Sequence, residues 1–252
     1  MKVTILGSGT STGVPVIGCD CAVCKSDNAA NKRTRSSALI TVEGKNILID
    51  TSTDLRAQSI SNNLKILDAV LYTHTHADHT HGIDDLRSFN MHKEGPIPCY
   101  GSPETIERIT EAFDYIFAGN KKGGWRPNLT VTSVSAPFEI SGTVVTPVPA
   151  RHGANSVYGY RIGPLAYLTD CSGVPSESME LLQGIELLII GALRKEPHPS
   201  HFSITEAIEL GKTLNAGKIV LTHLGHKIDH SECSKELPEG VMLATDGLVL
   251  EL

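Results

Sequence analysis

One short segment constrains this chain more than any other: HTHADH, residues 74–79, which directly follows the apolar run LDAVLYT. The run is typical of a strand covered on both faces. In extended chain, side chains two residues apart point to the same side, so His74 and His76 can bind one cation together. Asp78 and His79 follow where the chain turns and can face a second cation. Imidazole and carboxylate ligands suit zinc, manganese or iron and do not suit calcium. The alternative, a solvated histidine-rich loop, fits poorly at the end of a buried strand.

Apolar patterns along the rest of the chain predict more strands than helices. The predicted strands cover residues 2–7, 38–43, 45–50, 67–73, 129–135, 138–150, 158–170, 186–192 and 218–222, with a closing strand pair over 241–252. The predicted helices cover residues 54–64, with Asp54 as a candidate N-cap, 102–117, 177–183 and 204–215. No repeat and no linker rich in Pro, Gly or Ser divides the chain. We therefore expect a single α/β domain over residues 1–252, with two sheets between helical layers.

Here the sequence resembles the metallo-β-lactamase fold superfamily. Its signature, His-x-His-x-Asp-His with a following glycine, is matched by residues 74–79 and Gly82. The resemblance spans residues 1–252 and implies a four-layer αββα sandwich with a dinuclear metal site at one edge of the sheets. It also implies ligands after later apolar runs, which are matched in order by His152, Asp170 and His223.

The ligand assignment that this resemblance implies places two divalent metals, zinc or manganese, in neighbouring sites. One metal is held by His74, His76 and His152, the other by Asp78, His79 and His223, and Asp170 bridges both. Each later residue has a plainer interpretation on its own. A single histidine after a strand is often structural, and Asp170, followed by Ser-Gly, suits a turn cap. Only their joint order favours the metal site.

Three of the six cysteines, Cys19, Cys21 and Cys24, lie together in CDCAVC, which is untypical of a secreted disulfide framework. Three thiolates and one imidazole make a closed structural zinc site. The arrangement resembles the PhnP-type cyclic phosphodiesterase of the carbon-phosphorus lyase pathway. In that family a histidine three residues beyond the last active-site ligand completes the cluster, and this position is His226 here. The alternative is three free thiols beside a surface histidine.

The same resemblance implies hydrolysis of a small or cyclic phosphodiester, of the phosphoribosyl cyclic phosphate or nucleotide-like kind. A metal-bridged hydroxide would attack the phosphate and Asp78 would orient it. His201 would protonate the leaving oxygen, since histidine gains or loses a proton near neutral pH. His198 is a local competitor for that role. Two alternatives stay open: a thioester or lactone hydrolase with the same fold, and a non-catalytic metal-binding module. The full ligand set argues against the module, because such a module needs no open dinuclear site.

Charge and hydropathy restrict the expected partners. The formal net charge of -6 disfavours binding of long nucleic acid. No apolar stretch reaches the roughly 18 residues of a membrane span, and the first residues, MKVTILGSGT, lack the features of a signal peptide. We therefore expect a cytoplasmic enzyme with a small phosphodiester substrate and no membrane partner, and a homodimer is compatible with the sequence.

Several polar segments have no single interpretation. The glycine-rich residues 7–15 lack the GxGxxG pattern of dinucleotide sites and are expected to bring backbone near the metals. One loop suits either a basic lid over an anionic substrate or a merely solvated turn; it contains Lys121, Lys122, Trp125 and Arg126. Three further residues are equally undecided: Arg151, His81 and Asp84.

Overall fold

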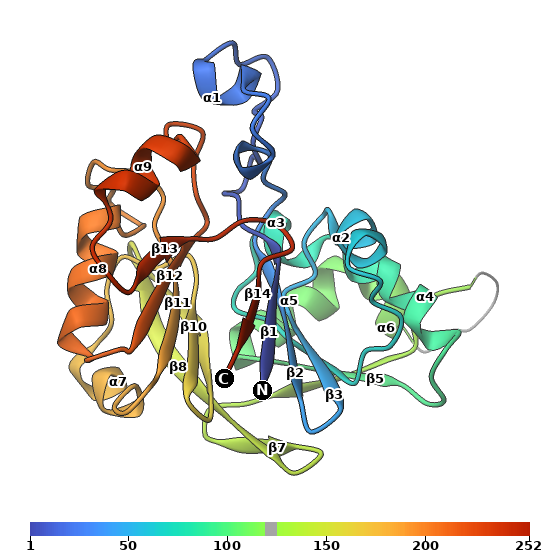
Figure 1. The fold of residues 1–252 in the computed structure, drawn as a ribbon. Helices are drawn as coiled ribbons and strands as arrows, with labels where there is room; N and C mark the ends of the chain where they lie inside the picture. Colours follow the sequence, from blue (N-terminus) through green and yellow to red (C-terminus); the bar gives the residue numbers. More distant parts are fainter. Residues whose placement is uncertain (119–124) are drawn as a thin grey trace.

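Two seven-stranded sheets face each other in the computed structural model, which describes residues 1–118 and 125–252 (Figure 1). The first sheet has the order β14-β1-β2-β3-β4-β5-β6. Its strands are β14 (Val249–Glu251), β1 (Lys2–Gly7), β2 (Ser37–Val42), β3 (Lys45–Ile49), β4 (Ala69–Leu71), β5 (Ile97–Gly101) and β6 (Leu129–Ser133). The second sheet has the order β13-β12-β11-β10-β9-β8-β7. Its strands are β13 (Val241–Leu243), β12 (Lys218–Thr222), β11 (Leu187–Gly191), β10 (Leu165–Leu168), β9 (Asn155–Ile162), β8 (Thr143–His152) and β7 (Phe138–Ile140).

Helices flank the two sheets, which confirms the predicted layering. In Figure 1, α2, α4 and α6 lie beside the first sheet, and α7, α8 and α9 lie beside the second. Within the described residues the α-helices are α1 (Ala22–Lys25), α2 (Leu55–Ser61), α3 (Ala77–Thr80), α4 (Leu86–Asn90), α5 (Pro103–Ala112), α6 (Asp114–Phe117), α7 (Ser176–Leu181), α8 (Ile204–Thr213) and α9 (His230–Glu236). Short 3-10 turns occur at η1 (Ala29–Asn31) and η2 (Ile83–Asp85). Among the described residues, every helix is too short or too polar to span a bilayer.

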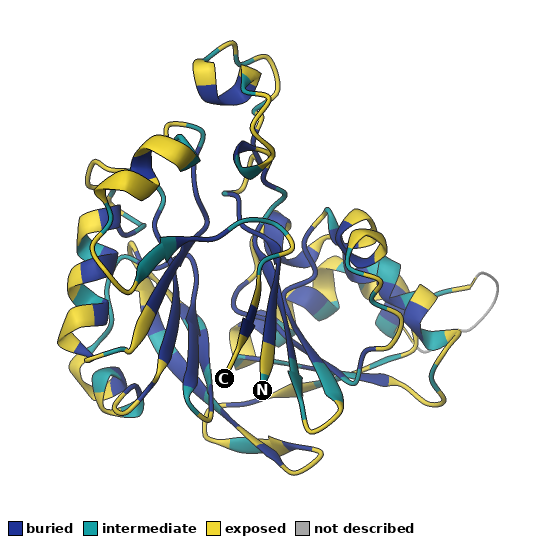
Figure 2. Cartoon of the chain, in the orientation of Figure 1, coloured by how far each residue is buried: buried dark blue, intermediate teal, exposed yellow. Residues whose placement is uncertain are grey.

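The central strands are buried on both faces, and this explains their continuous apolar sequences. On β10, Leu165 and Tyr167 pack in the core between the sheets, whereas Ala166 and Leu168 pack in the core beneath the helices. Successive side chains of a strand point to opposite faces, so a strand between two cores needs an apolar residue at every position. Figure 2 shows the resulting buried strands flanked by helices with exposed outer sides.

Two sequence-based predictions were wrong in detail, and one was confirmed only in part. Residues 241–252 do not form a strand pair, because β13 pairs with β12 and β14 pairs with β1 in the other sheet. The predicted helix over 102–117 is interrupted at Phe113, whose φ of -117° and ψ of 42° separate α5 from α6. Asp54 is the N-cap residue of α2, but its side chain makes no capping hydrogen bond, and its carboxylate accepts hydrogen bonds from Arg35 instead.

Strand direction explains why residues far apart in sequence meet at one edge. In the first sheet β3, β4 and β5 are parallel, and in the second β10, β11 and β12 are parallel. β8 runs in the same direction as β10, because both are antiparallel to β9. The carboxyl ends of strands that share a direction lie at the same edge of a sheet, where α/β proteins bind their ligands.

Candidate metal centre

The seven predicted ligands of the dinuclear site form two groups that share Asp170. The ligand atoms within each group all lie within 4.8 Å of one another. The first group contains His74, His76, His152 and Asp170, and the second contains Asp78, His79, Asp170 and His223. The side chains come from the ends of β4, β8, β10 and β12 and from α3, which begins directly after the β4 segment. This is the pairing that the family resemblance implies.

The backbone turns sharply where these ligands occur. Asp170 and His223 both adopt left-handed backbone, with φ of 47° and 56°. Residues other than glycine rarely adopt this region, and the conformation costs about 1 kcal/mol or more. His76 is still extended, with ψ of 150°, and α3 begins at Ala77. The backbone therefore changes from extended to helical within the HTHADH motif. His74 and His76, before the change, belong to the first group, and Asp78 and His79, after it, belong to the second.

Buried ligand atoms without a hydrogen-bond partner show that the two groups fit divalent metals. Among the described residues these atoms are His74 Nε2, Asp78 Oδ2, His79 Nε2, Asp170 Oδ2 and His223 Nε2. They are nonetheless close to one another: His79 Nε2 lies 3.1 Å from Asp78 Oδ2. Buried polar groups left unpaired cost about 1–3 kcal/mol each, and more when charged. A cation coordinated by these lone pairs would remove that cost, and imidazole with carboxylate suits a divalent transition metal.

Asp50 supports both groups, and it was not singled out from the sequence. Its buried carboxylate accepts hydrogen bonds from His79 Nδ1 at 2.7 Å and from Thr73 Oγ1 at 2.8 Å. Because Thr73 Oγ1 donates to Asp50, it accepts from His74 Nδ1 at 2.9 Å. Both imidazoles therefore direct Nε2 toward the metal positions, and such outer carboxylates tune metal affinity. One feature of the sequence could have indicated Asp50: it ends the apolar run NILID. This run forms β3, which pairs with β4.

His152 is oriented by a backbone group instead of a carboxylate. Its Nδ1 donates to the carbonyl oxygen of Ser200 at 2.7 Å, which leaves Nε2 free for the first group. The bond also joins the end of β8 to the segment that precedes α8.

Burial and charge set the protonation states of the ligands. Burial opposes ionisation of Asp170, yet the rings of His223 and His79 hold its pKa well below the usual range. Burial lowers the pKa of His74, which keeps that ring neutral. Burial also disfavours the charged form of His79, but Asp170 and Asp50 outweigh it and raise that pKa well above the usual value. A metal ion would therefore displace a proton from His79.

His201 lies against the ligands, whereas His198 lies farther out. The His201 ring stacks on His223 with centroids 5.1 Å apart and meets His152 edge-on at 4.7 Å. His198 contacts the His201 ring at 5.1 Å, and its Nδ1 accepts a hydrogen bond from the Ser200 amide. Burial lowers the pKa of His201 to about 3. Of these two histidines, His201 therefore lies closer to the two ligand groups.

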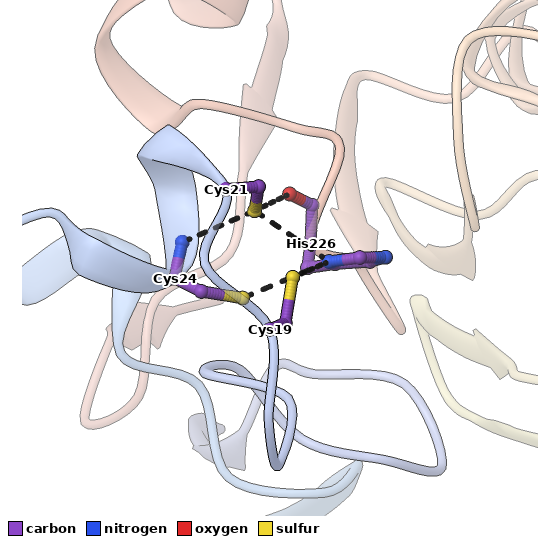
Figure 3. A group of neighbouring side chains, drawn as sticks. All are labelled: Cys19, Cys21, Cys24 and His226. Carbon is purple, nitrogen blue, oxygen red and sulfur yellow. Dashed lines mark hydrogen bonds between the residues drawn. The ribbon is translucent and has the colours of Figure 1, made fainter.

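The predicted cysteine cluster is also assembled, as Figure 3 shows. The Nδ1 atom of His226 lies 3.3 Å from Cys19 Sγ and 3.6 Å from the sulfurs of Cys21 and Cys24. A hydrogen bond from the Cys24 amide, with others from neighbouring thiols and His226, lowers the pKa of Cys21 to about 6, which favours the thiolate form that binds metals. The cluster lies at α1, which projects from the rest of the molecule in Figure 1.

Arg33 connects the cysteine segment to the loop that carries His223 and His226. Its side chain is only 2% exposed. One guanidinium nitrogen donates to the Gly225 carbonyl at 3.1 Å, and the other donates to the Ile228 carbonyl at 2.8 Å. These bonds hold the loop in place. The segment that carries His226 is therefore anchored before the cysteine cluster binds a metal.

A cleft of about 550 Å³ opens beside the first group. Three of its walls come from the metal ligands, from α5 and from the start of β9. The lining residues are His74, Thr75, His76, Thr80, His81, Glu104, Thr105, Arg108, Ile109, Glu111, Ala112, Phe113, His152, Asn155, Ser156 and Val157. Charged and hydroxyl side chains outnumber aliphatic ones, which suits a polar substrate.

The glycine-rich segment lies where it was expected. The Leu224 amide donates to the Ser8 carbonyl at 2.9 Å, and the Thr10 amide donates to the Leu224 carbonyl at 3.2 Å. Residues 7–15 therefore run beside the residue that follows His223.

The undecided side chains separate into two sets. His81 lines the cleft and contacts Phe113 edge-on. Asp84 accepts a hydrogen bond from the Tyr115 hydroxyl, and Arg126 donates to the Tyr115 carbonyl. Trp125 and Arg151 are not among the residues that line the cleft. Lys121 and Lys122 lie outside the described residues.

Residues 45–224 match the β-lactamase superfamily domain. Together with the two sheets and the paired ligand groups, this match defines a hydrolase of the metallo-β-lactamase fold with sites for divalent metal. The zinc-bound protein PqqB of Methylobacterium extorquens has the same fold, with a TM-score of 0.79 and 23% identity over the whole of both chains.

Two further relatives share more of the sequence. The crystal structure of a diphosphatase from the PhnP family is 41% identical, with a TM-score of 0.92, and the match covers 100% of this chain and 97% of that one. The chain therefore belongs to the PhnP family within the β-lactamase superfamily. An octanoyltransferase of Porphyromonas gingivalis is 40% identical over 253 residues, 98% of this chain. The chain spans about half, 51%, of that protein's length.

Proposed function

We propose that this protein is a phosphodiesterase that hydrolyses a small or cyclic phosphodiester, of the phosphoribosyl cyclic phosphate or nucleotide-like kind. The observation that carries this proposal is the pair of buried ligand groups that share Asp170 and open on a polar cleft. Among the ligands in the described residues, Asp78 and Asp170 are the two carboxylates that offset the charge of two divalent ions, so the centre attracts an anion. The 41% identical relative is described as a diphosphatase, which supports phosphate-ester chemistry.

The ligand groups would hold zinc or manganese, and the cysteine cluster with His226 would hold a structural zinc. Ions bound in the two groups supply Lewis-acid charge to phosphate oxygens and lower the pKa of water toward neutrality. The protein's part is to fix their positions through Asp50, Thr73 and the backbone of Ser200.

His201 would donate the proton that the leaving oxygen needs. Its ring lies against His152 and His223, so it is adjacent to both groups. Burial keeps the free ring neutral. An anionic phosphate beside the ring raises the histidine pKa, which would favour protonation of His201 when substrate is bound. Asp78, in the second group, would orient the attacking water.

Thioester hydrolysis is the second candidate, because one relative is named octanoyltransferase. An octanoyl chain needs an apolar groove, but Glu104, Arg108 and Glu111 all line the cleft. The match also leaves about half of the octanoyltransferase uncovered. The lining therefore favours the phosphodiester.

A substrate panel tests the proposal. The metal-replete protein, with zinc and separately with manganese, is assayed with bis-p-nitrophenyl phosphate, a nucleoside diphosphate ester, a lactone and an acyl thioester. We expect turnover of the phosphate esters, and its loss in Asp170→Asn but not in Asp114→Asn, an exposed control on α6. Turnover of the lactone or thioester alone would contradict the proposal, and no turnover of any ester would favour a non-catalytic module.

A further inference from the structure

A second cavity lies away from the metal centre, in a groove between α2 and α4 beside the first sheet (Figure 1). Its volume is about 340 Å³, which is within the range of sites that hold a whole small molecule. None of the described residues that line this α2–α4 groove also lines the metal cleft. The groove is therefore a separate candidate site, which the reaction at the metals does not use.

Two helical faces form the walls of the α2–α4 groove. On α2 and the turn after it, the lining positions are Arg56, Ser59, Ile60 and Asn63. This i, i+3, i+4, i+7 spacing is typical of one face of a helix. The opposite wall repeats the spacing from Asp85 to His92, along η2, α4 and the turn that follows. Side chains of both walls therefore face a common groove.

The two walls run in the same direction, because contacts join them at both ends. At the start, the amide of Gly82, just before η2, donates to the carbonyl of Thr51, which precedes α2, at 2.9 Å. At the far end, Lys93 Nζ donates to the carbonyl oxygens of Leu67 and Asp68, each at 3.1 Å. The lining residues that come first on each wall thus lie at one end of the groove, and those that come last lie at the other.

Charge differs between the two ends of the groove. At the first end lie Arg56 and Asp85; burial raises the pKa of Asp85, and Arg56 is one of the cations that oppose this rise. Here a carboxylate and a guanidinium offset each other. At the far end lie Lys65 and His92, and within the described residues neither forms an ion pair. The far end therefore carries positive charge, which a single anionic group would balance.

The middle of the groove combines apolar side chains with one unsatisfied hydroxyl. Phe89 is only 5% exposed, and Ile60 and Leu64 line the groove with it. Ser59 is 9% exposed, and its Oγ has no hydrogen-bond partner among the described residues. A buried hydroxyl without a partner is unfavourable. A polar group on a ligand in the groove would remove this cost.

We propose that the α2–α4 groove binds a small aromatic acid that carries a hydroxyl group at the end opposite its carboxylate. The carboxylate would lie at Lys65 and His92. The ring would pack on Phe89, since aromatic pairs gain more than their buried area alone provides. The hydroxyl would pair with Ser59 Oγ, because each can donate to and accept from the other. A simple fatty acid would leave Ser59 unpaired, since its tail has no polar group.

Three ligands that differ by one group test the inference. They are 4-hydroxycinnamate, cinnamate, which lacks the hydroxyl, and 4-hydroxycinnamamide, in which a neutral amide replaces the carboxylate. Calorimetry with the metal-replete protein gives the three dissociation constants without any turnover, so the result does not depend on the proposed function. We expect 4-hydroxycinnamate to bind about 10- to 100-fold more tightly than the amide, and about 3- to 10-fold more tightly than cinnamate, the ranges for charged and neutral hydrogen bonds.

Two variants assign these preferences to the groove. Lys65→Met should reduce the preference for the carboxylate over the amide about tenfold, because the unpaired cation is lost. Ser59→Ala should bring the preference for the hydroxylated acid over cinnamate close to unity. Two exposed residues outside this groove provide the matched controls, Lys212→Met on α8 and Ser61→Ala on α2, and both should preserve the preferences.

The inference is overturned if 4-hydroxycinnamate does not bind at millimolar concentration. It is also overturned if both preferences persist in Lys65→Met and Ser59→Ala, because the acid would then bind elsewhere, as at the metals. Vesicles of phosphatidylglycerol complete the test. Vesicle binding that is lost in Lys65→Met, without any binding of 4-hydroxycinnamate, would make the groove a membrane contact and would contradict the small-molecule site.

Discussion

At the scale of single residues, the metal centre depends on which nitrogen of each imidazole is free. The Nδ1 atoms of His79 and His74 donate hydrogen bonds to Asp50 and Thr73, respectively. That of His152 donates to the Ser200 carbonyl. Each Nε2 is then available to a metal. The chain holds these rings before any metal binds, so less ordering entropy opposes metal uptake.

Asp50→Asn should weaken metal binding about 10- to 100-fold, because an amide lacks the charge that holds His79 and Thr73. Titration against a competing chelator measures the affinity. Asp114→Asn, on exposed α6, is the matched control and should bind metal as the unsubstituted protein does. Equal affinities for all three proteins would contradict a positioning role for Asp50.

His201→Ala should slow hydrolysis of esters with poor leaving groups about 10²- to 10⁴-fold, the usual contribution of a general acid. The loss with p-nitrophenyl esters should be much smaller, since their leaving group needs little protonation. Comparison of kcat for methyl and p-nitrophenyl esters gives the two losses. His198→Ala serves as the control and should show neither, and equal losses in His201→Ala would exclude the acid role.

The ligands could be predicted from the sequence, but their supporting residues could not. A motif such as HTHADH fixes residue types and local spacing, so His74 and His79 stand out. Asp50 is one aspartate among many, and only the parallel pairing of β3 with β4 brings it to His79. Arg108 likewise has the appearance of an ordinary helix-surface residue until the cleft is seen.

At the scale of elements, Gly82 allows the loop after α3 to approach the segment after β3. An added Cβ at Gly82 would lie 2.0 Å from the Ser52 carbonyl oxygen and 3.0 Å from Leu55 Cβ. The Gly82 amide also donates to the Thr51 carbonyl at 2.9 Å. Gly82, the glycine of the family signature, is thus required because a side chain has no room at this position. Its backbone conformation does not require glycine, since a φ of -83° is open to any residue.

Gly82→Ala should lower the free energy of unfolding by about 3 kcal/mol, the upper range for overpacking, because backbone atoms would have to move. Urea unfolding at fixed metal concentration measures the change. Gly173→Ala is the matched control, since an added Cβ there meets nothing within 4 Å. If Gly82→Ala lost as little free energy of unfolding as Gly173→Ala, the loop after α3 and the segment after β3 could move apart at little cost, which would contradict the prediction.

The cysteine cluster acts at the same scale by holding the loop between β12 and α9. Cys21→Ser should remove about one equivalent of zinc and lower stability, while the two metals of the dinuclear site stay bound. Zinc content by mass spectrometry and the unfolding midpoint are measured together. Cys233→Ser, a cysteine on α9 outside the cluster, should keep its zinc. Unchanged zinc in Cys21→Ser would refute the structural site.

Element types could be predicted where apolar period and length agree, as for β11 and α8. The pairing of residues 241–252 could not, because local alternation does not show which distant strand is the partner. The break at Phe113 was also missed, since helical apolar spacing continues through it.

At the scale of the whole molecule, both sheets direct strand ends to one edge, and two groups of ligands meet there across the interface between the sheets. His74 and His79 come from the first sheet, whereas His152, Asp170 and His223 come from the second. Metals bound there would link the two sheets, so their removal should lower the stability of the whole protein and not of one loop.

Elemental analysis of the native, tag-free protein tests the central claim most directly. The account predicts about three transition-metal ions per chain, one for each of the two groups that share Asp170 and one zinc for the cysteine cluster. Fewer than two ions per chain, with none taken up when zinc or manganese is added, would contradict it.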